Sequence, residues 1–136
     1  MRAAAIDING NFMVVWRNSA LAIRGRCYDA AGTARGPEFQ VSELGNSQRY
    51  PAIAATSEGG FIVTWVGWAD GSGSGILGRL FDPECQALSS PFQVNSYTTG
   101  YQYGPAVGAD AAGNFVVAWS SDNGGFNYSE VFARRF

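Results

Sequence analysis

The chain has 136 residues, enough for one domain with a sizeable core, and combines 46% hydrophobic with only 15% charged residues. Frequent glycine and aromatic residues suit short strands joined by tight turns and exclude a disordered chain. The nine basic residues are all arginine and are scattered, so we expect no nucleic-acid partner. No apolar run approaches the roughly 20 residues that span a bilayer, so we expect no membrane partner. Residues 1–7 also lack the apolar stretch of a signal peptide.

The first fifty residues contain four short apolar segments separated by turn residues. They read AAAI at 3–6, NGNFMVVW at 9–16, IRGRCYD at 23–29 and FQV at 39–41. Each has the length of a strand, and glycine and asparagine between them provide the positive φ angles of tight hairpins. We therefore predict four antiparallel strands in residues 1–50.

The same motifs recur in the same order in residues 51–104 and in residues 105–136. The second series reads PAIAA, EGGFIVTW, ILGRLFD and FQV, and the third reads PAVGA, AGNFVVAW and VFARRF, without a fourth motif. Phe12, Phe61 and Phe115 are 49 and 54 residues apart, and three tryptophans keep the same spacing. Such periodicity predicts a single domain of three repeats, the last truncated. The predicted repeat core comprises Phe12, Trp16, Phe61, Trp65, Phe115 and Trp119.

Each repeat is predicted to form one blade of an all-β, propeller-like fold. The FVVAW-type strand is apolar on both faces, as a strand between two neighbouring sheets must be. The first strand of each repeat is built of small residues, which fit where several sheets converge on an axis. A β-trefoil or β-prism also contains three repeats and remains the alternative, although the missing third FQV segment disfavours a trefoil.

The motifs resemble a repeat that occurs in tandem in large bacterial extracellular and surface proteins. Its pattern is approximately P-x-V-A-x-D-x-x-G-N-F-V-V-x-W, then I-x-x-R-x-F-D, then F-x-V-N, and the likeness covers essentially the whole chain. The resemblance implies β-propellers and an extracellular or cell-surface location, and it provides no catalytic motif. The family repeats many times, whereas this chain contains fewer than three complete units.

Fewer than three blades cannot close a propeller, which usually has four to eight. An open arc exposes the apolar faces of its terminal blades, and large apolar patches are rare on soluble monomers. Two chains would form a ring of nearly six blades, with identical junctions related by two-fold symmetry. We therefore predict a homodimer.

Few residues of this chain suit catalysis or metal binding. Without histidine there is no Ser-His-Asp or Cys-His site and no imidazole ligand for zinc. The aspartates recur at turn positions, where they are expected to cap turns rather than to form a catalytic pair. Cys27 and Cys85 belong to different repeats, so we expect no disulfide between them. We expect no enzyme activity, no cofactor and no metal.

Aromatic residues that interrupt the repeat are the candidate ligand contacts, because they lie in predicted loops. They are Trp68, Tyr97, Tyr101, Tyr103, Phe126 and Tyr128. Exposed aromatic rings beside polar residues stack on sugars or anchor protein partners. The sequence thus predicts a non-catalytic binding module with carbohydrate as a candidate ligand. A structural or protein-interaction segment is the alternative, and a glycosidase-like enzyme is the least favoured function.

Overall fold

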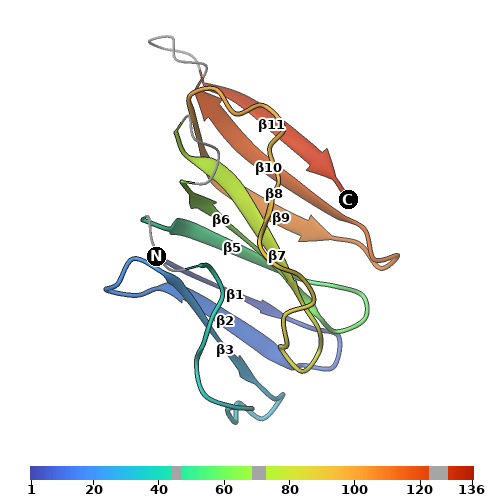
Figure 1. Cartoon of the computed structure of the whole chain (residues 1–136). Helices are drawn as coiled ribbons and strands as arrows, with labels where there is room; N and C mark the ends of the chain where they lie inside the picture. The colour runs from blue at the N-terminus through green and yellow to red at the C-terminus, as the bar shows by residue number, and fades with distance from the viewer. Residues whose placement is uncertain (44–46, 69–72, 123–128) are drawn as a thin grey trace.

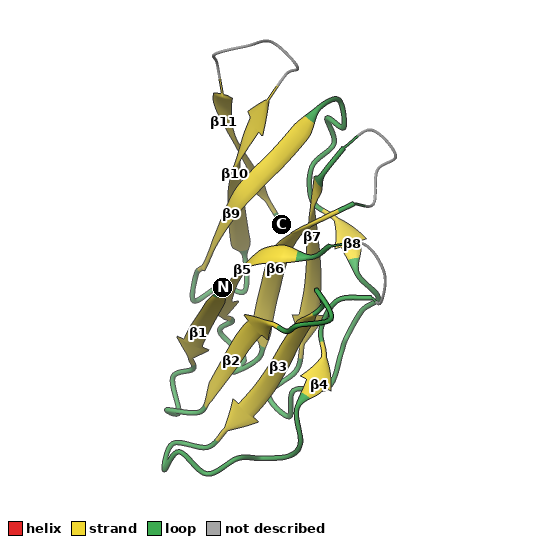
Figure 2. Cartoon of the chain, turned by 90° about the vertical axis from the view of Figure 1, so that its left-hand side faces the viewer, coloured by secondary structure: helices red, strands yellow, loops and turns green. Residues whose placement is uncertain are grey.

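The computed structural model describes residues 1–43, 47–68, 73–122 and 129–136, and these ranges contain strands and loops but no helix (Figures 1 and 2). No helix in the described ranges is long and apolar enough to cross a membrane. The strands are β1 (Arg2–Ile6), β2 (Phe12–Arg17), β3 (Ile23–Tyr28), β4 (Phe39–Gln40), β5 (Arg49–Ala55), β6 (Phe61–Gly67), β7 (Gly75–Phe81), β8 (Phe92–Gln93), β9 (Tyr101–Ala109), β10 (Phe115–Asp122) and β11 (Ser129–Arg135).

These strands form three antiparallel sheets, each from one of the segments in which the motifs recur. The orders are β1-β2-β3-β4, β5-β6-β7-β8 and β11-β10-β9, and we call these sheets blades 1, 2 and 3. Figure 1 shows the three sheets one after another along the molecule. This arrangement confirms the predicted propeller-like blades with an incomplete last blade, in place of a β-trefoil or β-prism. Closure of the ring by a second chain stays a prediction.

The hairpins that join the first two strands of blades 1 and 3 are closed by the predicted aspartate turns. Asp7 Oδ1 accepts hydrogen bonds from the backbone N–H groups of Asn9 and Asn11, at 2.8 and 2.9 Å. Asp110 does the same with the N–H groups of Ala112 and Asn114, both at 2.9 Å. Because an aspartate that binds the backbone two and four residues later fixes a tight turn, the recurring carboxylates are structural.

The first strands of the blades lie side by side and form the inner edge of the arc. β1 contacts β5, and β5 contacts β9. The fourth strands, β4 and β8, are two residues long and lie at the opposite edge of their sheets. An added Cβ atom at Gly78 would lie 3.0 Å from the ring of Phe92 in β8. Glycine in the third strand therefore makes room for the phenylalanine of the fourth.

Blade 2 is covered on both faces, and this makes β6 the central strand of the core. All seven residues of β6 are buried. One face of blade 2, including Phe61 and Trp65, packs against Met13 and Val15 of blade 1. The opposite face, including Ile62, packs against blade 3. A strand between two sheets must be apolar on both sides, which explains the FIVTW sequence.

Two members of the predicted core are only half-buried. Trp65 is fully buried, and Phe61, Phe115 and Trp119 are also buried, but Phe12 and Trp16 are not. Their side chains lie on the face of blade 1 that points away from blade 2, because they alternate with Met13. The core expectation thus fails for Phe12 and Trp16 in this chain, since no blade covers that face.

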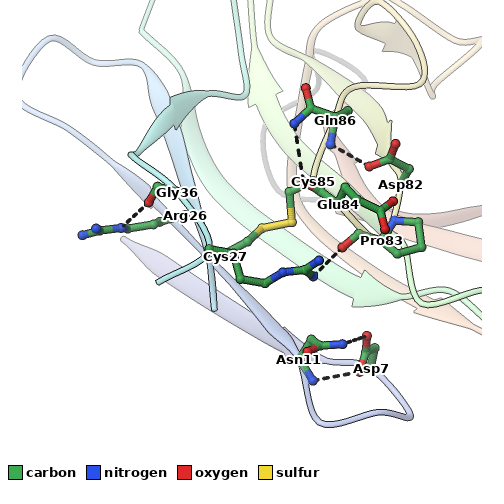
Figure 3. The surroundings of a disulfide bond; sticks show 11 residues. Asp7, Asn11, Arg26, Cys27, Gly36, Asp82, Pro83, Glu84, Cys85 and Gln86 are labelled. Carbon is green, nitrogen blue, oxygen red and sulfur yellow. Dashed lines mark hydrogen bonds between the residues drawn. A yellow bond between two sulfur atoms is a disulfide. The ribbon is translucent and has the colours of Figure 1, made fainter. Parts of the chain in front are cut away.

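The expectation about the cysteines is wrong: Cys27 and Cys85 form a disulfide with a Cα–Cα distance of 6.6 Å (Figure 3). Cys27 lies in β3 of blade 1, and Cys85 follows β7 of blade 2. Consecutive repeats pack face to face, and the turn after β7 lies against blade 1. There Arg35 Nη1 donates to the carbonyl oxygen of Pro83 at 2.7 Å. The disulfide therefore connects two neighbouring blades.

Candidate functional site

A hollow of about 450 Å³ opens at one end of the inner strands, where β5 and β9 begin. We call it the aromatic hollow. Four aromatic residues, two polar residues, one valine and one glycine surround it. They are Arg49, Tyr50, Val66, Trp68, Ser74, Tyr101, Tyr103 and Gly104. Its volume lies within the range of roughly 300–1,000 Å³ typical of small-molecule sites.

A second hollow of about 310 Å³ continues this surface toward blade 1. It shares Tyr50 and Gly104 with the aromatic hollow and adds Arg2 of β1. The two hollows together cross the starts of all three inner strands. A ligand in this place would contact every blade of the chain.

The aromatic side chains of the hollow remain accessible although they touch one another. Trp68 and Tyr101 contact edge to face, with ring centroids 6.0 Å apart and planes at 87°. Tyr50, Trp68, Tyr101 and Tyr103 are between 39% and 51% exposed. Four half-exposed rings around one concavity are an apolar surface with polar edges, and such a surface suits an amphipathic ligand.

A buried amide fixes the start of β9 between the two tyrosines. Gln102 is fully buried, and its side chain donates to the carbonyl oxygen of Thr99 at 3.1 Å and accepts from Asn95 Nδ2 at 3.1 Å. Its backbone N–H donates to the carbonyl oxygen of Ser74 at 2.9 Å. Because neighbouring residues of a strand point to opposite faces, anchoring Gln102 inward holds Tyr101 and Tyr103 outward.

Tyr50 is the aromatic residue of this site that was not predicted from the sequence, and Arg49 was not predicted either. Its φ angle is +53°, in the left-handed region that side chains rarely adopt. The equivalent repeat position, immediately before the proline of the first strand, is Gly104 with φ +63°. A tyrosine where the repeat uses glycine is a strained choice, and such strain is concentrated at functional sites. The repeat alignment contained this signal, because Tyr50 replaces the glycine.

The structure brings three of the six predicted contact residues together. Trp68, Tyr101 and Tyr103 line the aromatic hollow. Tyr97 is 46% exposed, but it does not belong to the lining, and its carbonyl oxygen accepts from Asn95 Nδ2 at 2.8 Å. Phe126 and Tyr128 lie outside the described residues.

Arg49 lines the aromatic hollow, and Arg2 lines the second hollow. The inner strands β1, β5 and β9 contain no aspartate or glutamate, whereas Asp122 of β10 lies opposite Tyr101 in register. The turn carboxylates bind their own turns. Hydrogen bonds from Asn114 lower the pKa of Asp110, with the larger effect from the Asn114 side chain and the smaller from its backbone. Within the described ranges, no group of three or more acidic, cysteine or histidine residues could hold a metal ion.

No family model and no curated protein matches the chain. Solved structures share its fold. A protein of unknown function from Dyadobacter fermentans superposes with a TM-score of 0.66 at 11% identity, covering 97% of this chain and 36% of that one. An endo-arabinase from Bacteroides thetaiotaomicron gives 0.60 at 16% identity, with 97% and 54% coverage. A GH43 endo-arabinanase from Bacillus licheniformis gives 0.55 at 15% identity, with 98% and 52% coverage.

These likenesses show a propeller-type β fold, and they correct our functional prediction. Two of the three structures are an endo-arabinase and an endo-arabinanase, which are glycosidases. We predicted a non-catalytic binding or interaction module and regarded a glycosidase as the least favoured function. This prediction is therefore wrong. The chain spans about half the length of these two enzymes and about a third of the Dyadobacter fermentans protein. The resemblance to bacterial surface repeats stays a prediction, since no family model matches.

Proposed function

We propose that this chain forms the substrate-holding part of a glycoside-hydrolysing β-propeller. The aromatic hollow carries the proposal, because it places Tyr50, Trp68, Tyr101 and Tyr103 around one concave surface at the end of the inner strands. Sugar rings present apolar C–H faces that stack on aromatic side chains and hydroxyl groups that require hydrogen-bond partners.

The polar groups of the hollow supply those partners. Arg2 and Arg49 provide guanidinium donors at its edges, and an arginine can only donate. The tyrosine hydroxyl groups can both donate and accept. A neutral saccharide needs both kinds of partner, and the surface reaches from β1 to β9, which suits a chain of several sugar units.

Glycoside hydrolysis requires two carboxyl groups about 5–10 Å apart. The inner strands of the described part of this chain have none, and Asp7 and Asp110 are engaged in turns. We therefore propose that the catalytic pair comes from carboxyl groups outside the inner strands.

The inter-blade disulfide is consistent with this assignment. Disulfides persist in oxidising compartments, such as the periplasm and the cell exterior, where polysaccharides are degraded. Because an endo-arabinase and an endo-arabinanase share this fold, arabinan is the first substrate class to test.

Titration with linear arabinan oligosaccharides, followed by tryptophan fluorescence and calorimetry, tests the proposal. We expect saturable binding that Trp68→Ala or Tyr103→Ala weakens at least tenfold. Tyr97→Ala is the matched control, since Tyr97 is equally exposed but lies outside the hollow. Absence of binding across arabinan, galactan, xylan and glucan oligosaccharides, or equal losses in Tyr97→Ala and Tyr103→Ala, contradicts it.

A further inference from the structure

Blade 1 presents an aromatic face that no blade of this chain covers. We call it the open face and define it by Ile6, Phe12, Val14, Trp16, Arg26 and Tyr28. These residues lie opposite one another in register across β1, β2 and β3, on the side away from Met13 and Val15. Ile6 is 65% exposed, and Phe12 stacks on Tyr28 with ring centroids 4.9 Å apart.

The equivalent faces of blades 2 and 3 are buried junctions. Phe115 stacks on Phe136 at 4.8 Å, the same geometry as Phe12 on Tyr28, but this pair packs against blade 2. In blade 2, Phe61 is likewise buried against blade 1. The open face therefore has the construction of a blade junction and lacks only the neighbouring blade.

Each junction uses the same contact from the fourth strand of the preceding blade. Phe39 of β4 contacts Phe81 at 5.6 Å between ring centroids. Phe92 of β8 contacts Phe136 at 5.7 Å. Tyr28 is the equivalent residue of blade 1. The docking partner must therefore supply a phenylalanine of this kind for Tyr28.

An arginine hydrogen bond accompanies that aromatic contact at both junctions. Arg79 Nη1 donates to the carbonyl oxygen of Val41 at 3.0 Å, and Arg134 Nη1 donates to that of Val94, also at 3.0 Å. Both acceptors directly follow the short fourth strand of the preceding blade.

The side chain of Arg26 is held in the same way as that of Arg79, so it can make the same hydrogen bond to a neighbouring blade. Its Nε donates to the carbonyl oxygen of Gly36 at 3.0 Å, as Arg79 Nε donates to that of Ser89 at 2.8 Å, and its guanidinium lies 5.8 Å from the centroid of the Tyr28 ring. Among the described residues Arg26 has no acceptor on another blade.

We propose that the open face docks onto a four-stranded blade of the same repeat that carries a Phe-x-Val segment. The phenylalanine of that segment packs on Tyr28, and the carbonyl oxygen of its valine accepts a hydrogen bond from Arg26. A second copy of this chain is less able to provide these two contacts. The uncovered face of its blade 3 exposes Val116 and Val131, but the described residues of that blade form three strands and include no Phe-x-Val strand.

The test adds the missing blade to the intact chain. A further copy of residues 50–103 is placed before Met1, so that its Phe-x-Val segment lies one repeat ahead of Arg26. We expect the extended chain to unfold at a higher temperature than the original. Arg26→Ala removes the Gly36 hydrogen bond in both chains, but it should lower the unfolding temperature of the extended chain by about 2–4 °C more than that of the original chain, the effect of one additional lost hydrogen bond. Arg79→Ala is the matched control and should lower both.

Three results would overturn the proposal. One is an extended chain that fails to fold or gains no stability, because the added blade then does not find the open face. Another is an Arg26→Ala effect of the same size in both chains. The third comes from sedimentation of the original chain: a dimer that Trp16→Ala dissociates would show that a second copy occupies the face.

Discussion

The two junctions between blades share one set of contacts and differ in what surrounds it. At both, a phenylalanine of the fourth strand contacts an aromatic residue of the next blade, and an arginine donates to a valine carbonyl oxygen. The junction of blades 1 and 2 adds the disulfide Cys27–Cys85. At the junction of blades 2 and 3, the face of blade 3 that packs against blade 2 instead contains Phe132 stacked on Trp119 of the same blade, at 6.2 Å. The repeated residues thus determine how blades associate, and the unrepeated ones determine how each junction is reinforced.

Truncating the repeated tryptophan that is buried between two blades should have the largest effect. Trp65 is fully buried between blades 1 and 2, so Trp65→Ala should cost about 3–5 kcal/mol of unfolding free energy. The equivalent Trp16 lies on the open face, and Trp16→Ala should cost about 1 kcal/mol. Urea denaturation of both variants measures the difference. Equal costs would mean that burial does not distinguish the two positions.

Removal of the disulfide should weaken one junction only. Cys27→Ala with Cys85→Ala should cost about 2–4 kcal/mol, because the bond closes a loop with a sequence separation of 58 residues. Urea denaturation of the double variant, with and without reductant, provides the measurement. Reductant should destabilise the native chain and leave the variant unaffected. A native chain that is insensitive to complete reduction would show that packing alone holds blades 1 and 2.

The equivalent glutamines at the two junctions should respond differently. Gln102 makes its side-chain hydrogen bonds in a fully buried position, so Gln102→Leu should cost about 1–3 kcal/mol. Gln48 is buried with its Oε1 atom lacking a partner among the described residues, so Gln48→Leu should be nearly neutral. Thermal unfolding of the pair compares them. A larger loss in Gln48→Leu would contradict the difference inferred from the hydrogen bonds.

The exposed turn of blade 3 should give the smallest effect. Hydrogen bonds from Asn114 lower the pKa of Asp110 below its ordinary value of 3.8. A carboxyl group with a lowered folded pKa adds stability above the unfolded value, and that stability is lost as the pH falls through the folded value. NMR titration of the Asp110 carboxyl should show the lowered pKa, and Asn114→Ala should move it toward 3.8. An unchanged titration in the variant would exclude Asn114 as the cause.

The aromatic hollow was only partly predictable from the sequence. Trp68, Tyr101 and Tyr103 were recognised because aromatic residues are unexpected in loops, and the structure places them together. Tyr50 was missed, since a tyrosine before a strand is unremarkable until its position is aligned with Gly104 and its positive φ is known. Tyr97 is also an aromatic residue in a loop, and yet it lies outside the lining. An aromatic residue in a loop is expected to be exposed, but the sequence does not show whether several such residues face the same hollow.

The sequence by itself determined the strands, the turns and the three blades, because these depend on local periodicity and on glycine and aspartate at fixed offsets. Only the tertiary structure decided which residues of different repeats meet. It brought Cys27 to Cys85, left Phe12 and Trp16 half-buried, and placed Tyr50 beside Tyr101 and Tyr103. The physical reason is that contacts between blades depend on the order and facing of whole sheets, which local patterns do not encode.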